Sequence, residues 1–248
     1  MAYALKFGSY TFPGTFAPIS DARDANVSTW QLPRLDGGGA SVRKLRPKSI
    51  TLAGGVTNFN GGSSPRTQLD TMLTSLQGTA SLYFDDDRYY RNCQLRDHSV
   101  EYDPTSYTRY SRMNLVFVTG DPFSYSTTLT SSGTNAMSTS PKSLSITTTG
   151  NASSLPKFTF STSGATSVAM TFTNSTTGEV FTLNGAIASG ATIIVDSLEK
   201  TVTISGVDYL SLFEGVFPSL ASGANTISIA WTAGGFTNVA YEYRNRWY

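Results

Sequence analysis

One stretch in the first half of the chain has the apolar spacing of a helix that is buried along one side. In SPRTQLDTMLTSLQG, residues 64–78, the apolar positions follow an i, i+3, i+4, i+7 pattern: Leu69, Met72, Leu73 and Leu76. Ser64 is a good N-cap, Pro65 suits the first helical position, and Gly78 suits the left-handed residue that ends a helix. The pattern therefore predicts one helix in this stretch.

Alternating apolar and polar residues around this helix predict strands at residues 46–56, 79–84, 88–96 and 111–123. The second and third strands are separated only by three aspartates, so they form a hairpin. Its inner face is expected to carry Ala80, Leu82 and Phe84 from one strand, and Tyr89, Cys93 and Leu95 from the other. This order predicts an α+β domain in which one helix packs on a sheet or barrel.

The second half reads as strands throughout. Eight candidates are separated by turn signals: residues 143–149, 156–162, 167–174, 179–184, 191–197, 201–206, 225–231 and 239–247. The one helical possibility is a short turn at residues 209–213. Eight short strands at this spacing predict a β-sandwich or jelly roll, so the fold class is mainly β.

The number of charged residues also differs between the two halves of the chain. Residues 1–125 hold 24 charged side chains and residues 126–248 hold 11, and the change falls in a Ser/Thr-rich stretch at residues 124–141. We therefore predict two domains, residues 1–130 and 131–248. The formal net charge of +1 gives no global field toward nucleic acid or membrane.

Targeting and redox signals are also weak. One cysteine, Cys93, excludes an intramolecular disulfide framework. The N-terminus has no basic region followed by an apolar run, and no stretch approaches the roughly 18 apolar residues of a membrane span. We expect a soluble chain without membrane anchoring, made in a reducing cytoplasm.

The most acidic motif, FDDDRYYR at residues 84–91, raises the possibility of a metal or catalytic site. A calcium loop needs alternating oxygen ligands, a glycine and a closing glutamate, and Asp85, Asp86 and Asp87 do not meet that spacing. Aspartates also favour turns, so the motif is interpreted as a hairpin tip. An interface role stays open, in which this tip, with Arg88 and Arg91 beside it, contacts a neighbouring subunit.

Other candidate chemistry is sparse. His98, the only histidine, lies between Asp97 and Ser99, but neighbours on a strand point to opposite faces and cannot form a catalytic relay. We interpret His98 as structural or superficial and Cys93 as a buried, inert thiol. One His and one Cys cannot supply a zinc site. The sequence predicts no catalytic, metal or cofactor-binding site, and so no enzyme.

The densest basic run is RKLRPK, with Arg43, Lys44, Arg46 and Lys48. It lacks interleaved aromatic residues, so a solvated strand face is the preferred interpretation, and a protein or DNA-channel contact is the alternative. The glycine runs at residues 37–39, 54–55 and 61–62 fit no phosphate-loop pattern and are interpreted as flexible loops. Trp231 is expected to pack in the core.

Several of these local patterns occur together, and in this order, in one family. The first half has a strand ending in glycine at residues 46–56, the leucine-patterned helix, an acidic hairpin, and a closing segment that ends in DPFSY: Asp86, Arg88, Tyr90, Asp121, Pro122 and Tyr125. The second half adds the remaining matching positions: Gly150, Asn151, Pro156, Phe217, Pro218, Leu220, Gly223, Asn225, Ile227, Tyr243, Arg244, Trp247 and Tyr248. On these residues the chain resembles the distal tail proteins of siphoviruses, the long-tailed phages with non-contractile tails.

The resemblance implies a split-barrel-like first domain, of the tail-tube type, and a galectin-like second domain without a long insertion. It implies a homo-hexameric ring at the tail tip of the virion, assembled in the host cytoplasm. That ring would join the tail tube protein to hub or tip proteins and to fibre or receptor-binding proteins. DNA would pass through its lumen without being read. The alternative function is a carbohydrate-binding module that recognises host-wall glycans.

Overall fold

The computed structural model describes residues 5–22, 25–26, 29–31, 38–40, 44–45, 47–57, 64–84, 87–102, 110–163, 166–188, 190–233 and 235–248. It confirms the mainly β fold, with one α-helix among these residues. The chain divides into two compact units, Met1–Tyr125 and Ser126–Tyr248. Each unit has its own hydrophobic core.

The first unit is built on one antiparallel sheet. Its elements are β1 (Lys6–Phe7), β2 (Tyr10–Thr11), β3 (Ala17–Ala22), β4 (Ala25–Asn26), β5 (Thr29–Gln31), β6 (Gly38–Ala40), β7 (Lys44–Leu45), β8 (Lys48–Thr57), α1 (Pro65–Ser75), β9 (Thr79–Tyr83), β10 (Arg88–Tyr102) and β11 (Tyr110–Thr119). The sheet order is β2-β1-β9-β10-β11-β8-β3, while β4 pairs with β7 and β5 with β6. β12 (Ser124–Ser126) spans the point where the units join in sequence.

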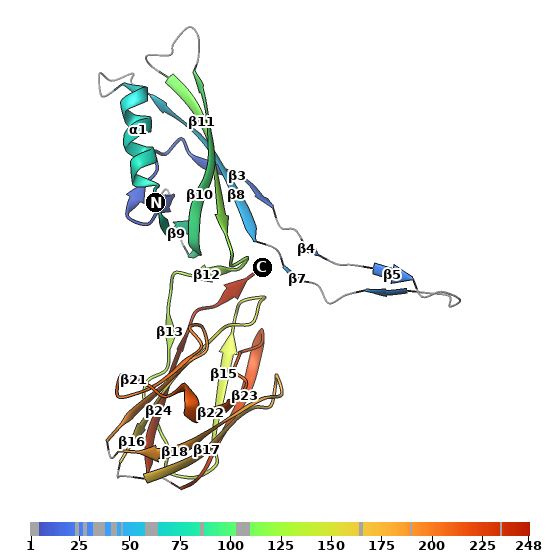
Figure 1. The fold of residues 1–248 in the computed structure, drawn as a ribbon, viewed down its shortest axis with the longest axis vertical. Coiled ribbons are helices and arrows are strands. Elements are labelled where there is room, and N and C mark those ends of the chain that lie inside the picture. The colour runs from blue at the N-terminus through green and yellow to red at the C-terminus, as the bar shows by residue number, and fades with distance from the viewer. Residues whose placement is uncertain are drawn as a thin grey trace. The chain divides into compact units, whose positions relative to one another are not determined.

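The predicted helix is confirmed as α1, which runs alongside the sheet of the first unit (Figure 1). Ser64 caps it, because its Oγ accepts a hydrogen bond from the Thr67 amide at 3.2 Å. The stripe Leu69, Met72 and Leu76 is fully buried in the core of this unit. Gly78 has the left-handed φ of +86° that lets the chain turn back into β9.

The hairpin of β9 and β10 is also confirmed, but its inner face differs from the prediction. Tyr90 lies opposite Leu82, and the register shifts before Cys93, which lies opposite Ala80. Asn92, with a φ of +50°, sits in this irregularity. The extra residue brings Tyr90 and Cys93, three positions apart, onto the buried face. Tyr89 instead stacks on Tyr83, with ring centroids 5.1 Å apart.

The second unit contains all eight predicted strands and forms a sandwich of two antiparallel sheets. Its elements are β13 (Thr130–Ser131), β14 (Asn135–Ala136), β15 (Lys142–Thr148), β16 (Lys157–Thr162), β17 (Thr166–Asn174), β18 (Glu179–Ile187), β19 (Thr192–Asp196), β20 (Thr201–Ile204), β21 (Val207–Asp208), the 3-10 turn η1 (Leu210–Leu212), β22 (Phe213–Gly215), β23 (Gly223–Ala233), β24 (Phe236–Tyr243) and β25 (Arg246–Trp247). One sheet has the order β13-β24-β16-β19-β20-β21, with β14 on β24, and the other β15-β23-β17-β18-β22.

The core of the second unit lies between these sheets, because strand alternation directs phenylalanines from both sheets toward it. Phe158 meets Phe172 edge-on at 4.8 Å, and Phe172 stacks on Phe181 at 4.7 Å. Trp231 packs partly buried against this core, as predicted, with its ring 5.8 Å from that of Phe236. In the part of the chain that the structure describes, no helix has the length and apolarity needed to cross a membrane.

Candidate functional site

The acidic hairpin tip lies between β9 and β10. Asp85 and Asp86 fall outside the described residues. Asp87 is exposed, and its Oδ1 lies 3.8 Å from Nε of Arg88. An ion pair with an exposed partner at this distance contributes little to stability.

The basic run does not behave as one surface. Arg43 and Arg46 fall outside the described residues, and Lys44 lies in β7 opposite Asn26. Lys48 is only 1% exposed, so the interpretation as a solvated face is wrong for this residue. Alternation along β8 places Lys48 on the same buried face as Ile50.

The buried ammonium of Lys48 is held by an aromatic side chain. Nζ donates a hydrogen bond to the hydroxyl of Tyr90 and lies 4.1 Å from the centroid of that ring. Phe84 stacks on the same ring at 4.6 Å. A buried cation needs such hydrogen-bond and ring contacts to offset its lost hydration. Lys48 is therefore a packed residue of the core of the first unit.

Arg91 belongs to a second aromatic cluster, which involves the closing segment of the first unit. Its guanidinium carbon lies 5.5 Å from the ring centroid of Tyr125, and Tyr89 contacts the same ring at 5.9 Å. The Tyr125 hydroxyl donates to Oδ2 of Asp121 at 2.5 Å, while Oδ1 accepts from the Phe123 amide at 3.1 Å. The DPFSY motif therefore closes a turn by hydrogen bonds rather than forming a catalytic group.

The two titratable candidates on β10, Cys93 and His98, have different environments. Cys93 is fully buried, and burial raises the pKa of its thiol to about 12, which keeps it protonated and unreactive near neutral pH. His98 is exposed and lies opposite Leu115. The predictions of a buried thiol and a superficial histidine are both confirmed.

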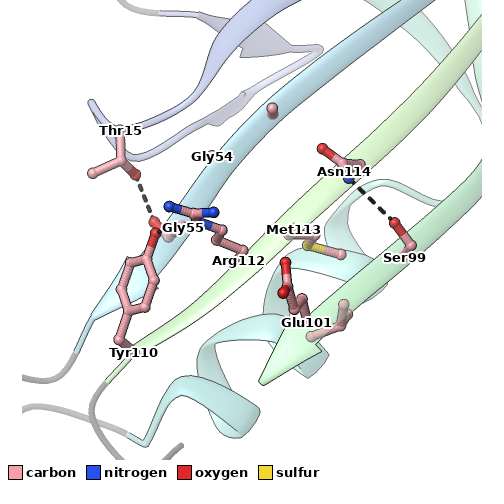
Figure 2. A pocket seen from close by; sticks show the side chains of 11 residues that line it. Thr15, Gly54, Gly55, Ser99, Glu101, Tyr110, Arg112, Met113 and Asn114 are labelled. Carbon is pink, nitrogen blue, oxygen red and sulfur yellow. Dashed lines mark hydrogen bonds between the residues drawn. The ribbon is translucent and has the colours of Figure 1, made fainter. Parts of the chain in front are cut away.

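An open pocket of about 530 Å³ lies on the sheet of the first unit (Figure 2). Residues of β8, β10 and β11 line it, together with Thr15: Ala53, Gly54, Gly55, Ser99, Val100, Glu101, Tyr110, Arg112, Met113 and Asn114. The Thr15 hydroxyl donates to the Gly55 carbonyl at 2.5 Å, and Nδ2 of Asn114 donates to Oγ of Ser99 at 3.4 Å. The wall is polar and carries one acid, Glu101, and one base, Arg112.

Two glycines shape this pocket. A Cβ on Gly54 would lie 2.4 Å from the Phe16 ring, and one on Gly55 would lie 2.8 Å from the Tyr110 ring. The interpretation of this glycine pair as a flexible loop is wrong, because both residues lie inside β8. Gly38 and Gly39 likewise lie in β6, whereas residues 61–62 fall outside the described chain.

Ser99 and His98 do not form a catalytic relay at this pocket. Its serine, Ser99, is hydrogen-bonded to an amide, and the histidine next in sequence lies on the other face of β10. Across the described ranges, no three His, Cys, Asp or Glu side chains gather where a metal ion could bind. Sequence reasoning missed the pocket because its lining joins strands far apart in the chain.

Comparison with known proteins finds a family model that the second unit matches. Residues 149–247 match the model described as siphovirus-type tail component, C-terminal domain. No curated protein sequence gives a match. These residues contain most of the second-half positions that carry the resemblance predicted from the sequence, and the family match confirms it.

Solved structures extend the likeness over the whole chain. The Dit protein (gp 19.1) of SPP1, described as a paradigm of the hub adsorption apparatus in phages that infect Gram-positive bacteria, has a TM-score of 0.75. It is 13% identical, over 99% of both chains, so it establishes a shared fold. Two structures of the phage P2 baseplate in its activated conformation, with Ca and with Sr, give TM-scores of 0.48 and 0.45 at 9% identity, over 96% of this chain and 94% of theirs.

Proposed function

We propose that the whole chain is a distal tail protein at the tip of a phage tail, because its second unit matches the siphovirus-type tail component family. The observation that carries the proposal is the family match over residues 149–247. The fold shared with SPP1 Dit along the full chain supports it. The role is structural, and no catalytic step is part of it.

In this proposal six copies form a ring that joins the tail tube to hub and fibre or receptor-binding proteins. Residues 1–130 form the ring, with a split-barrel-like fold of the tail-tube type, and residues 131–248 are a galectin-like sandwich. DNA passes through the lumen without being read. A net charge of +1 supports this, because a strongly basic protein would hold DNA rather than let it move. The ring is assembled in the host cytoplasm and remains in the virion.

The hairpin tip is our proposed contact between subunits. Asp87 and Arg88 carry opposite charges side by side at the end of an ordered hairpin, so a neighbour could meet either sign. Replacing Asp85, Asp86 and Asp87 by lysine should weaken ring assembly and leave the monomer folded. Asp70→Lys, which changes an exposed acid on α1, is the matched control.

Light scattering and negative-stain images of the purified protein and of assembled tails test the ring. We expect rings from the wild type and the Asp70→Lys variant, and fewer rings from the triple variant. A wild type that stays monomeric at high concentration and adds no ring to tails would contradict the proposed function. Unchanged assembly of the triple variant would reduce the tip to a plain turn.

Glycan binding by the second unit is the second candidate. Tyr209 and Tyr248 are exposed there, and exposed tyrosine rings can stack on sugars. Titration with host-wall polysaccharide should show binding that Tyr209→Ala and Tyr248→Ala weaken. No binding at millimolar ligand would remove this candidate.

A further inference from the structure

Exposed apolar side chains concentrate in one short segment of the second unit, residues 207–216, which we call the crossover. It contains β21, η1 and β22, and so links the edge strand of one sheet to the edge strand of the other. Val207, Tyr209, Leu210 and Val216 are 37–59% exposed, and Val180 on neighbouring β18 is 42% exposed. Scattered exposed apolar residues are ordinary, but a group of this kind marks an interaction surface.

The crossover is fixed to the sandwich by hydrogen bonds along its length. The Tyr209 amide donates to the Val202 carbonyl at 2.8 Å, and the Leu210 amide donates to Oδ1 of Asp208 at 3.0 Å. The Val216 amide donates to the Val180 carbonyl at 3.0 Å. The exposed side chains therefore stand on an ordered backbone, which lowers the entropy lost when a partner binds.

Two consecutive side chains of the crossover, Leu212 and Phe213, pack against the core of the domain. Phe213 stacks between Phe181, at 5.1 Å, and Phe217, at 4.2 Å. Leu212 lies over Gly185, where a Cβ would come within 2.8 Å of it. The segment thus has a packed inner face, and its remaining apolar side chains form an outer face rather than a misplaced core.

The charge of the crossover is acidic. Residues 201–217 contain Asp208 and Glu214 and no lysine or arginine. The nearest lysine, Lys200, lies over the Phe217 ring, with Nζ 5.0 Å from its centroid. Apolar side chains beside uncompensated carboxylates complement a partner that alternates apolar and basic residues.

We propose that the crossover docks an extended segment, with alternating apolar and basic side chains, from another protein of the tail tip. The proposal rests on the proposed function, which places such proteins beside this chain. β22 is the last strand of its sheet among the described residues, so its free edge can pair with an added strand. A second copy of this unit fits less well, because residues 126–248 hold five basic and six acidic side chains and offer no basic complement.

Photo-crosslinking in assembled tails identifies the occupant. p-Benzoylphenylalanine is placed at position 210 of the full chain, and at position 129 as a control, because Leu129 and Leu210 are both 44% exposed. We expect position 210 to crosslink to a lysine- or arginine-containing peptide of a different tail protein, and position 129 not to do so. A crosslink to a second copy of this chain, or no crosslink, would overturn the proposal.

Substitution then tests the chemistry. Leu210→Asp and Glu214→Lys should each lower the amount of that partner on purified tails at least tenfold, while Leu129→Asp leaves it unchanged. Ring formation is measured in parallel by negative stain. If rings are absent from the wild type, the proposed function fails. If rings form and the partner stays on both variants at wild-type level, the docking surface alone is wrong.

Discussion

At the residue scale, buried amide side chains fix the loops of the second unit. Asn225 is fully buried, and its Oδ1 accepts from the Ala221 amide at 2.8 Å. Its Nδ2 donates to the carbonyls of Ala221 and Gly223, at 2.9 and 3.1 Å. Asn174, also fully buried, donates from Nδ2 to the Ser219 carbonyl at 2.7 Å. These bonds satisfy backbone groups where no strand partner does so.

Asn225→Ala should therefore lower the free energy of unfolding by about 1–3 kcal/mol, because the Ala221 amide loses the acceptor that Asn225 provides, while the Ala221 carbonyl keeps the hydroxyl of Thr148. Urea unfolding followed by circular dichroism measures the loss. Asn184→Ala, on the exposed face of β18, is the matched control and should change stability by less than about 0.5 kcal/mol. Equal effects of the two substitutions would contradict this role of Asn225.

Cys93 gives the first unit a dependence on alkaline pH. Burial raises the pKa of its thiol from the ordinary value of 9.0 to about 12. Below pH 9 the thiol is protonated in both the folded and the unfolded chain, and its full contribution to stability is present. As the pH rises from 9 toward 12, the unfolded chain loses this proton first, so stability falls, by up to about 1.4 kcal/mol per pH unit.

The Cys93 contribution is measured by urea unfolding of the first unit at pH 8, 9 and 10. Partly buried tyrosines such as Tyr10, whose pKa burial also raises, act in the same direction. The Cys93→Ala variant separates the two effects, because it should lose less stability than the wild type between pH 8 and 10. Identical pH profiles for wild type and variant would refute the assignment.

At the scale of elements, β8 and the turn at residues 13–16 approach each other closely because Gly54 in β8 has no side chain. A Cβ on Gly54 would lie 2.4–2.6 Å from three atoms of the Phe16 ring. The Phe16 ring is buried and 5.5 Å from that of Phe12, so it has little room to move. The glycine thus allows the turn at residues 13–16 to cross the strand and wall the pocket.

Gly54→Ala should destabilise the first unit by about 1–3 kcal/mol, because an inserted methyl group forces the packed ring aside. Urea unfolding gives the value, and a crystal structure would show the displaced turn. Gly120→Ala is the control, since a Cβ there meets nothing within 4 Å. If Gly54→Ala leaves the free energy of unfolding unchanged, the turn can move without destabilising the unit, and the prediction is wrong.

At the scale of the whole molecule, two separate cores predict that damage in one unit stays there. Phe172 is fully buried in the second core and Phe117 in the first. Phe172→Ala should destabilise the second unit by about 3–5 kcal/mol, because it leaves a cavity. The labelling rate of Cys93 in the first unit should stay unchanged, while Phe117→Ala should raise it. Faster labelling in both variants would show that the units unfold together.

Periodicity along the sequence by itself determined α1, its cap at Ser64, β8 to β11 of the first unit with the β9–β10 hairpin, and eight strands of the second unit. These depend on neighbours within one turn or one strand, which are adjacent in sequence. The collinear motifs predicted the family whose model residues 149–247 match.

Only the tertiary structure decided which side chains of β8 and β10 are buried. Because of the irregularity at Asn92, Tyr90 and not Tyr89 is buried in the core. Lys48 of β8 is also buried, and it contacts Tyr90. Phe16 lies 38 residues before Gly54, so the pocket could not be read from either segment. The crossover likewise could not be predicted, because it links β21 and β22, which become sheet edges only when the sandwich folds. Burial is set by contacts between distant residues, and sequence spacing carries no record of them.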